Sequence, residues 1–158
     1  MSTTPHIGIN KAGRAKVGKE LGKVLADSYS LYLKTHNYHW NVKGPHFHSL
    51  HTLFEEQYTE LATAVDDLAE RIRALGEMAP GSYRQFSKLT KIEEAPDTPP
   101  EALEMAEQLA QGHEAVAGTC RELIPIAEEV EDEVTVDMMI GRMTVHDKAA
   151  WMLRSLAA

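Results

Sequence analysis

Residues 39–51 read His-Trp-Asn-Val-Lys-Gly-Pro-His-Phe-His-Ser-Leu-His, and this stretch decides the fold. At its centre, Gly44-Pro45 is a turn signal, because the residue before a proline is kept out of the helical region. On both sides hydrophobic residues recur at alternating spacings of three and four, the period of an amphipathic helix. The stretch therefore predicts the corner of a helical hairpin, with one helix from about Lys11 and a second over about 46–75.

A long connection follows this hairpin. Residues 77–99 contain several prolines and one short segment, around 83–89, that is consistent with a helix. The pattern Thr98-Pro99-Pro100-Glu101 resembles a capping box and predicts the start of a third helix. Pro125 should kink this helix near its end.

An acidic break at residues 128–133 precedes a fourth predicted helix over about 135–156. No strand-like alternation appears, so the predicted class is all-α. Four helices with a long link between the second and third are typical of a ferritin-like bundle. We expect this bundle over residues 11–158, after a flexible tail of residues 1–10.

Size and composition limit the classes of protein that the chain can form. Its 158 residues suffice for one domain, and its 43% hydrophobic and 25% charged residues are ordinary for a globular protein. No apolar run approaches the roughly 18 residues of a membrane helix, and the first residues lack the apolar core of an export signal. Cys120 is the only cysteine, which excludes an internal disulfide. We therefore expect a cytoplasmic protein.

His39 and His51 stand six residues before and after Pro45. In an antiparallel hairpin with its corner at Pro45, the two histidines come level, one on each helix. Imidazoles that face each other across a helix pair are suitable ligands for iron or zinc. Glu55 follows His51 by four residues, so it lies one turn further along the same helix face.

Asp66 and Glu70 form a second pair with the same spacing of four. Fifteen residues of helix separate Asp66 from His51, or roughly 22 Å, whereas metal–ligand bonds are about 2 Å long. One chain therefore cannot bring both pairs to one metal ion. Two copies of this helix, antiparallel about a two-fold axis near Glu60, place the histidine end of one opposite the acids of the other. Mixed imidazole and carboxylate ligands favour iron that alternates between Fe(II) and Fe(III).

Each residue taken alone has a simpler explanation. A pair of acids four apart is commonly a solvated helix face, and a single buried histidine is commonly a hydrogen-bonded part of a core. His46 and His48 are more typical of surface residues than of ligands. The other histidines are not expected to bind metal: His6, His36, His113 and His146. The combination of level histidines with acids related by a two-fold axis favours the metal site.

These residues resemble the Dps family of mini-ferritins. The resemblance includes residues 39–47, His51 and Asp66-Asp-Leu-Ala-Glu-Arg, and extends to Thr135-Val-Asp-Met and the closing Trp151-Met. It implies a hollow shell of twelve chains with ferroxidase centres at the two-fold interfaces. Family members oxidise Fe(II), typically with hydrogen peroxide in preference to oxygen, and store Fe(III) mineral inside. This activity removes both ingredients of hydroxyl-radical chemistry.

By position, the resemblance implies the origin of each ligand. His39 and His51 would come from one subunit, and Asp66 and Glu70 from its two-fold partner. Trp40 matches a tryptophan beside the family's site, where it would donate electrons and limit the escape of radicals. The alternative is that Trp40 is simply a packed aromatic residue.

Glu55 departs from the family pattern, which usually has aspartate one turn after His51. Glutamate is one methylene longer and would reach the metal directly or through water. In the family, acids near the start of the fourth helix line pores at a three-fold axis. Asp137 matches these best, with Glu128 and Glu133 as weaker matches. Three copies of an acid around an axis would concentrate Fe(II) and guide it inward; the alternative is a solvated acidic loop.

Some family members bind DNA through basic N-terminal tails, but residues 1–10 here contain no lysine or arginine. The first basic residues lie on the predicted first helix: Lys11, Arg14, Lys16 and Lys19. The net charge of −8 opposes binding to a polyanion. We expect DNA binding to be weak at neutral pH and moderate salt, or helped by divalent ions or lower pH.

The sequence is compatible with three functions. The prediction is a ferroxidase and iron store that protects DNA and the cell from oxidative damage. The alternative from another class is a nucleoid-binding protein that shields DNA physically, with iron chemistry secondary. A third, weaker reading is zinc sequestration, because histidine and carboxylate sites accept zinc readily. Under the first function, zinc is expected as a competitor of iron.

Overall fold

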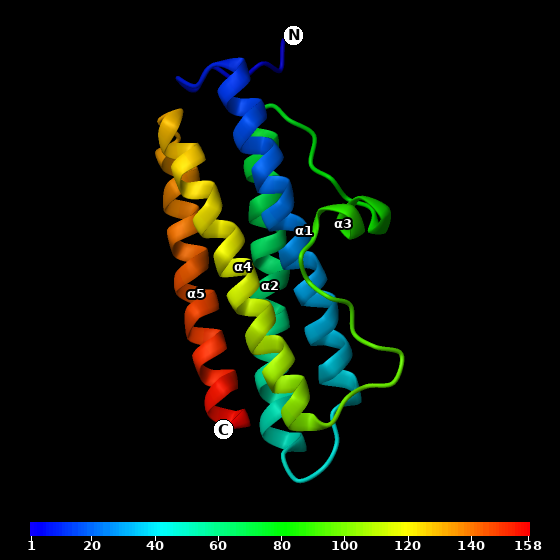
Figure 1. Ribbon diagram of the computed structural model, residues 1–158. Coiled ribbons are helices and arrows are strands. Elements are labelled where there is room, and N and C mark those ends of the chain that lie inside the picture. The colour runs from blue at the N-terminus through cyan, green and yellow to red at the C-terminus, as the bar shows by residue number, and fades with distance from the viewer.

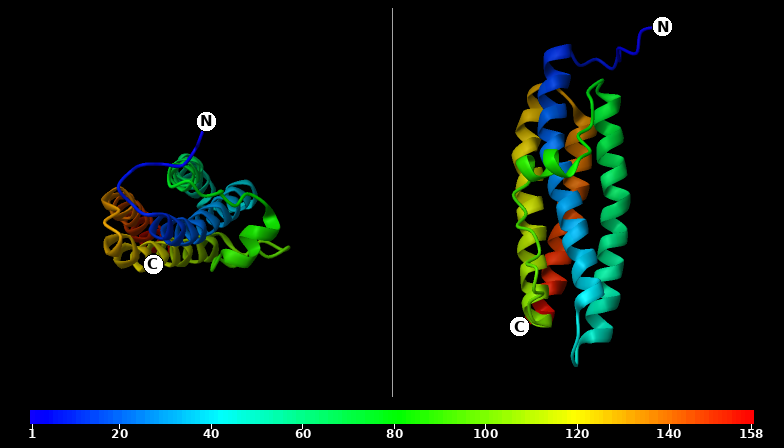
Figure 2. Two further views of the ribbon diagram at one scale, coloured as in Figure 1. Left: turned by 90° about the horizontal axis from the view of Figure 1, so that it is seen from above. Right: turned by 90° about the vertical axis from the view of Figure 1, so that its right-hand side faces the viewer.

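The computed structural model describes residues 1–158 and contains helices but no strands (Figure 1). The helices are α1 (Lys11–Asn41), α2 (Phe47–Ala74), α3 (Tyr83–Leu89), α4 (Ala102–Glu129) and α5 (Glu133–Ala157). The hairpins α1–α2 and α4–α5 pack side by side through α1 and α4, and the link after α2 runs the length of the bundle (Figures 1 and 2). The predicted four-helix bundle with a short extra helix is confirmed. None of these helices combines the length and apolar character that crossing a membrane requires.

The predicted inward stripes form the core. All seven residues of the stripe on α1 are buried: Val17, Leu21, Val24, Ser28, Leu31, Thr35 and Tyr38. Eight inward residues of α2 are buried as well, and the stripe ends at buried Leu75 just beyond the helix. The stripe of α4 is less complete, because Leu103 is exposed and Ile124 is half-buried near the helix ends.

The glycine-rich start of α1 is held by packing. A Cβ atom at Gly18 would lie 2.8 Å from Cγ of Glu77, so only a residue without a side chain allows this close approach. The Asn10 side chain caps the helix by accepting a hydrogen bond from the Gly13 amide at 2.8 Å. These contacts offset the low helix propensity of glycine in the first turns.

Arg14 is buried and has a structural role, contrary to the expectation that it faces DNA. Its Nε atom donates to the main-chain oxygen of Leu75 at 3.0 Å, and its Nη1 atom donates to that of Ile9 at 2.7 Å. The guanidinium thus joins the N-terminal segment to the end of α2. Lys11, Lys16 and Lys19 are exposed.

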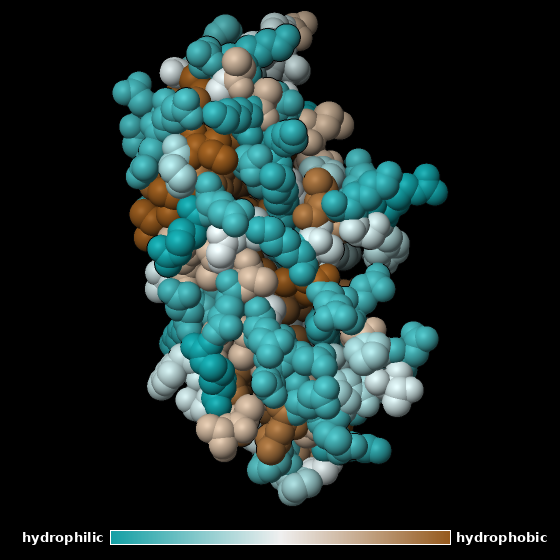
Figure 3. All heavy atoms as spheres, viewed as in Figure 1, coloured by the Kyte–Doolittle hydropathy of each residue, from teal (hydrophilic) through white to brown (hydrophobic).

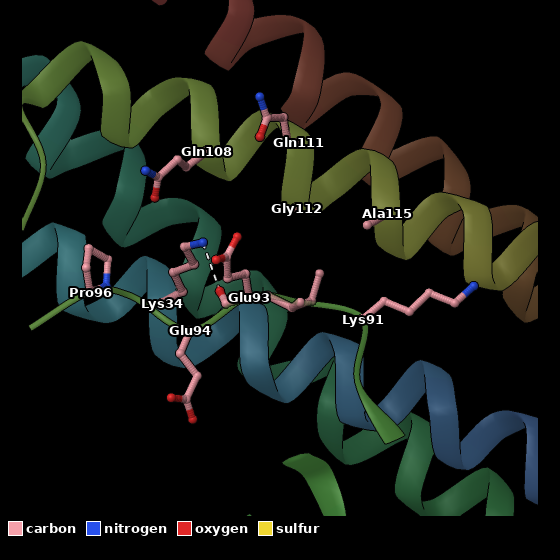
Figure 4. Close-up of a pocket in the computed structure, with 10 residues that line it drawn as sticks. Lys34, Lys91, Glu93, Glu94, Pro96, Gln108, Gln111, Gly112 and Ala115 are labelled. Atoms are coloured by element: carbon pink, nitrogen blue, oxygen red, sulfur yellow. Dashed lines mark hydrogen bonds between the residues drawn. The ribbon is translucent and has the colours of Figure 1, made fainter. Parts of the chain in front are cut away.

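The long link between α2 and α4 is fixed by polar side chains of α1. The carboxylate of Asp27 is fully buried and accepts three hydrogen bonds: from Thr90 Oγ1 at 2.8 Å, the Lys91 amide at 2.7 Å and Thr119 Oγ1 at 2.7 Å. Further along the link, Lys34 Nζ donates to the main-chain oxygen of Glu93 at 2.9 Å (Figure 4). Asp27 therefore connects α1, the link and α4 at one point.

Two predicted helix starts differ from the structure. The capping box at Thr98 is wrong, because α4 begins at Ala102 with Glu101 as its N-cap, which makes no side-chain capping bond. The fourth long helix begins at Glu133, two residues earlier than predicted. Asp132 caps it by accepting from the Thr135 amide at 3.0 Å, and it also accepts from Arg71 Nη2 at 2.6 Å. One acid of the run 128–133, Asp132, is therefore buried and forms an ion pair with Arg71 of α2.

A second polar cluster lies inside the bundle between α2, α4 and α5. Arg142 on α5 forms a two-pronged ion pair with Glu60 of α2, at 2.6 and 2.8 Å. His113 and His146 are buried, with their Nδ1 atoms 2.8 Å apart. Burial lowers the pKa of His113 to about 3, and the Arg142 cation adds to the effect. Burial also lowers the pKa of His146 well below its usual value, helped by His113 and Arg142.

Cys120 is also buried in this core. Burial raises the pKa of its thiol to about 12, so the group is a neutral thiol at physiological pH.

We predict that Asp27→Ala lowers the free energy of unfolding by about 3 kcal/mol, because it leaves three buried donors without their acceptor. Urea unfolding at a fixed protein concentration measures the change. Asp97→Ala, at an exposed acid of the same link, is the matched control and should have little effect. An equal loss in both variants would contradict the role given to Asp27.

We also predict that acid weakens the fold through His113 and His146. Both have folded-state pKa values below the unfolded value of 6.5, so the unfolded chain binds more protons below that pH. Their stabilising contribution is therefore complete above pH 6.5 and falls below it, by up to about 1.4 kcal/mol per pH unit for each histidine.

Urea unfolding at pH 7 and pH 5 tests this expectation. Replacing both histidines by glutamine should flatten the pH dependence, although the neighbouring Arg142 and Glu60 remain. His48→Gln, at an exposed site, should leave the dependence as it is. An unchanged slope in the double variant would show that other groups cause the acid sensitivity.

Candidate metal centre

The corner between α1 and α2 brings two histidines face to face. Gly44 adopts a φ of 101°, which favours glycine and allows the chain to reverse within a few residues. His39 and His51 then stack with their ring centroids 3.9 Å apart and their planes 14° from parallel. The level placement expected from their equal distance to Pro45 is what the structure shows.

Reciprocal hydrogen bonds fix both rings. His39 Nδ1 lies 2.8 Å from the main-chain oxygen of His51, and His51 Nδ1 lies 2.8 Å from that of His39. A carbonyl oxygen only accepts, so each Nδ1 must carry the hydrogen and donate. In the neutral rings each Nε2 atom therefore keeps its lone pair, which is the form that binds a metal ion. The main chain of each helix orients the candidate ligand on the other.

Aromatic side chains surround this pair. Phe47 stacks on His51 with centroids 4.9 Å apart, and Tyr58 stands edge-on to His39 at 5.1 Å. Trp40 is 59% exposed, and its ring is tilted against that of His36 with the centroids 3.8 Å apart. The His36 ring lies 4.3 Å from that of Tyr58. The indole is thus connected to the histidine pair through other rings.

The carboxylates lie on an exposed face of α2. Glu55, Asp66 and Glu70 are all exposed, whereas His39 is buried and His51 is half-buried. At 3.6 residues per turn, the arc from His51 to Glu70 covers only about 100° of the helix circumference. All the candidate ligands of α2 therefore share one side, although roughly 22 Å of helix separates His51 from Asp66.

Small side chains occupy the same side of α2 between the two ends. Thr59, Ala62 and Thr63 are exposed and short, so a second helix can approach closely there. Within one chain, no three His, Cys, Asp or Glu side chains come together as a metal site. The chain holds two well-oriented imidazoles at one end of this face and two carboxylates at the other.

The remaining predicted positions lie on the surface. His46 and His48 are exposed at the corner, and Glu128, Glu133 and Asp137 are exposed at the α4–α5 end. Sequence reasoning missed the buried pair of His113 and His146. Its only signal was that His113 falls on the inward stripe of α4.

Comparisons with known proteins identify the family of the chain. Residues 18–158 match the family of ferritin-like domains. The chain is 39% identical over 137 residues to DNA protection during starvation protein 2 of Bacillus anthracis, covering 85% of this chain and 92% of that one. It is 40% identical over 151 residues to an uncharacterised low temperature-induced protein of Nostoc, covering 95% and 84% respectively.

Two solved structures are similar over nearly the whole fold. Dps from Staphylococcus aureus is 39% identical, with a TM-score of 0.86 over 90% of this chain and 95% of that one. The DPS protein of Vibrio cholerae O1 is 30% identical, with a TM-score of 0.92 over 100% and 99%. The latter is described as a member of a superfamily of ferritin-like diiron-carboxylate proteins. The bundle, its corner histidines and these similarities together establish that the chain belongs to the Dps family of ferritin-like proteins.

Proposed function

We propose that this protein is a ferroxidase and iron store that oxidises Fe(II) with hydrogen peroxide at sites shared by two chains. The observation that carries the proposal is the stacked pair of His39 and His51, whose Nδ1 atoms are committed to main-chain oxygens. Two imidazole lone pairs are thereby oriented in advance, and the carboxylates that would complete the site lie at the far end of α2.

A two-fold axis near Glu60 supplies the missing ligands. Two antiparallel copies of α2 would place Asp66 and Glu70 of each chain beside the histidines of the other. The exposed small residues in the middle of the same face support such an approach. Glu55 lies one turn beyond His51 and would add a carboxylate from the histidine side, directly or through water.

Iron is the substrate at this site. Neutral imidazoles with carboxylates and open positions are a suitable donor set for Fe(II) and for the harder Fe(III) product. Two Fe(II) ions each give one electron to hydrogen peroxide, whose O–O bond breaks, and two protons complete two water molecules. Zinc accepts the same donors and would compete with iron.

Trp40 is placed to act as a reserve electron donor. Its indole contacts the His36 ring, which contacts Tyr58, and Tyr58 contacts His39. When a single Fe(II) meets peroxide, the second electron would come from Trp40 in place of a radical escaping into solution. The role rests on this chain of ring contacts.

Assembly into a twelve-chain shell is part of the proposal. Large apolar side chains of α5 are exposed in the single chain: Val134 at 58%, Ile140 at 49% and Trp151 at 61%. Figure 3 shows hydrophobic residues on the upper left of the molecule, where α4 ends and α5 begins. Exposed apolar surface of this kind is typical of protein contacts. Asp137, with Glu133 and Glu128, would line a pore for Fe(II) where three chains meet.

Mixed shells test whether the site is shared. We predict that His51→Ala and Asp66→Ala each abolish rapid peroxide-dependent Fe(II) oxidation while the shell still forms. Co-assembly of the two variants in equal amounts should restore about a quarter of the wild-type rate, because half of the two-fold pairs then contain one intact site of two. Stopped-flow absorbance of the Fe(III) product measures the rate.

Asp67→Ala is the matched control, since Asp67 is exposed beside Asp66 but points away from the ligand side of α2. It should keep the wild-type rate. If mixed shells stay as inactive as their parents, the ligands belong to one chain and the proposal is wrong.

A second function, physical protection of DNA, is considered because a relative in Bacillus anthracis is named DNA protection during starvation protein 2. The basic surface available for it is small. Lys11 and Lys19 are exposed, Lys16 pairs with Glu129 at 3.0 Å, and Arg14 is buried. We therefore propose that DNA binding is weak and secondary to iron chemistry.

In a gel-shift assay, we predict that complexes with DNA form at about 50 mM salt and disappear by about 200 mM, because the net charge of −8 keeps the affinity low and salt weakens the phosphate contacts further. Lys11→Gln with Lys19→Gln should abolish the shift and leave iron oxidation intact. A tight complex that resists salt would instead make DNA binding a principal function.

A further inference from the structure

The groove between α2 and α5 contains features that the ferroxidase site does not use. A cavity of about 250 Å³ lies there, lined by Gln57 and Glu60 of α2, His113 of α4, and Met152 of α5. A neighbouring cavity of about 490 Å³ shares Leu53, Glu56 and Met152 with it. The two together form one groove with polar and apolar walls.

The hydrogen bonds beneath this groove determine which ring nitrogen carries the hydrogen, first in His146 and then in His113. Arg142 Nη2 lies 3.1 Å from His146 Nε2, and a guanidinium only donates, so this nitrogen of His146 accepts. The hydrogen of neutral His146 is then on Nδ1, which donates to His113 Nδ1 at 2.8 Å. His113 must therefore carry its own hydrogen on Nε2.

That Nε2–H group has no partner in the chain, although His113 is only 2% exposed. The same is true of both side-chain polar atoms of Gln57, which is 8% exposed. Buried polar groups are rarely left unpaired, because each unmade bond has a large desolvation cost. Both side chains line the cavity, so a molecule held there can satisfy them.

The site favours an uncharged ligand. Glu60 is neutralised by its ion pair with Arg142, and His113 has no charge to offer. Glu56 and Lys148 have opposite charges and both line the cavity. The cavity therefore has no net charge that would attract an anion or a cation. The ligand must accept a hydrogen bond from His113 and exchange bonds with the Gln57 amide. A metal ion does not fit, because the free nitrogen of His113 carries a hydrogen.

We propose that this groove binds hydrogen peroxide. Each of its two oxygens both donates and accepts, so one can accept from His113 Nε2–H while the other donates to Gln57 Oε1. The identity of the ligand rests on the proposed function, in which peroxide is the oxidant and the uncharged co-substrate. The groove then holds peroxide at a place separate from the iron ligands.

Oxidation of Met152 can report whether peroxide is bound in the groove. A thioether sulfur attacks one peroxide oxygen, the O–O bond breaks, and the sulfur gains that oxygen as a sulfoxide while the other leaves as water after a proton shift. Met152 lines the groove and is only half-exposed, whereas Met78 is 79% exposed on the link after α2. Peroxide bound in the groove oxidises Met152 in a saturable manner, and free peroxide oxidises Met78 in proportion to its concentration.

The test uses assembled, iron-free protein treated with increasing peroxide, and peptide mass spectrometry to follow each sulfoxide. We expect the rate at Met152 to saturate and that at Met78 to rise linearly. Gln57→Leu should slow Met152 oxidation at low peroxide by about two- to tenfold, the effect of losing one hydrogen bond. Gln111→Leu, at an exposed glutamine of α4, should change neither rate. His113→Phe removes the hydrogen-bond donor from the other wall and should also slow Met152 oxidation. This variant tests the site if Gln57→Leu assembles poorly.

A linear rate at Met152 that neither variant changes would overturn the site and leave a groove filled by water alone. Because the assay contains no iron, its result is independent of the ferroxidase proposal. Failure of wild-type shells to oxidise Fe(II) with peroxide would overturn that proposal, and with it the reason for peroxide as the ligand, whereas saturation at Met152 would still establish the binding site.

Discussion

The structure depends on a pair of hydrogen bonds in which each helix of the first hairpin orients a histidine of the other. His39 and His51 exchange Nδ1–H donors and main-chain acceptors across the corner. This exchange fixes the register of α1 against α2, because a shift of one residue would break both bonds. It also fixes the chemistry, because it reserves both Nε2 lone pairs. The same few atoms therefore hold the corner of the hairpin and orient the two candidate ligands.

A long straight helix separates the two halves of the candidate site. α2 carries imidazole at one end of its exposed face and carboxylates at the other, and its own rigidity keeps them apart. In the proposed geometry, such a helix completes a metal site only when a second copy lies against it. Under the proposed function, assembly and activity are then linked, since a chain without a partner has oriented ligands but no complete centre.

Periodicity predicted most of the fold. The stripes of α1 and α2, the corner at Gly44-Pro45 and the short helix α3 all follow from local sequence, because the residues that decide them are close along the chain. The capping box at Thr98 failed locally, because α4 begins at Ala102. The other two wrong predictions concern residues whose partners are distant in sequence. In the sequence Arg14 resembles a surface residue, because its partner Leu75 is distant along the chain. Asp132 likewise resembles one more acid of an exposed run, because its partner Arg71 is distant.

The candidate site shows the same division. Spacing alone placed His39 level with His51 and separated both from Asp66, since helix geometry converts residue number into distance. Spacing could not give the tautomers, which depend on where two carbonyl oxygens lie. Nor could it find the polar cluster beneath the α2–α5 groove, whose members Glu60, His113 and Arg142 come from three helices.

Under the proposed function the protein handles an oxidant, and the burial of Cys120 then has a consequence for the proposed shell. The thiolate is the reactive form of cysteine, and a thiol with a pKa of about 12 supplies almost none of it at neutral pH. Its burial also keeps a second sulfur out of reach. Disulfides between neighbouring subunits of the proposed shell are therefore not expected to form under oxidative stress.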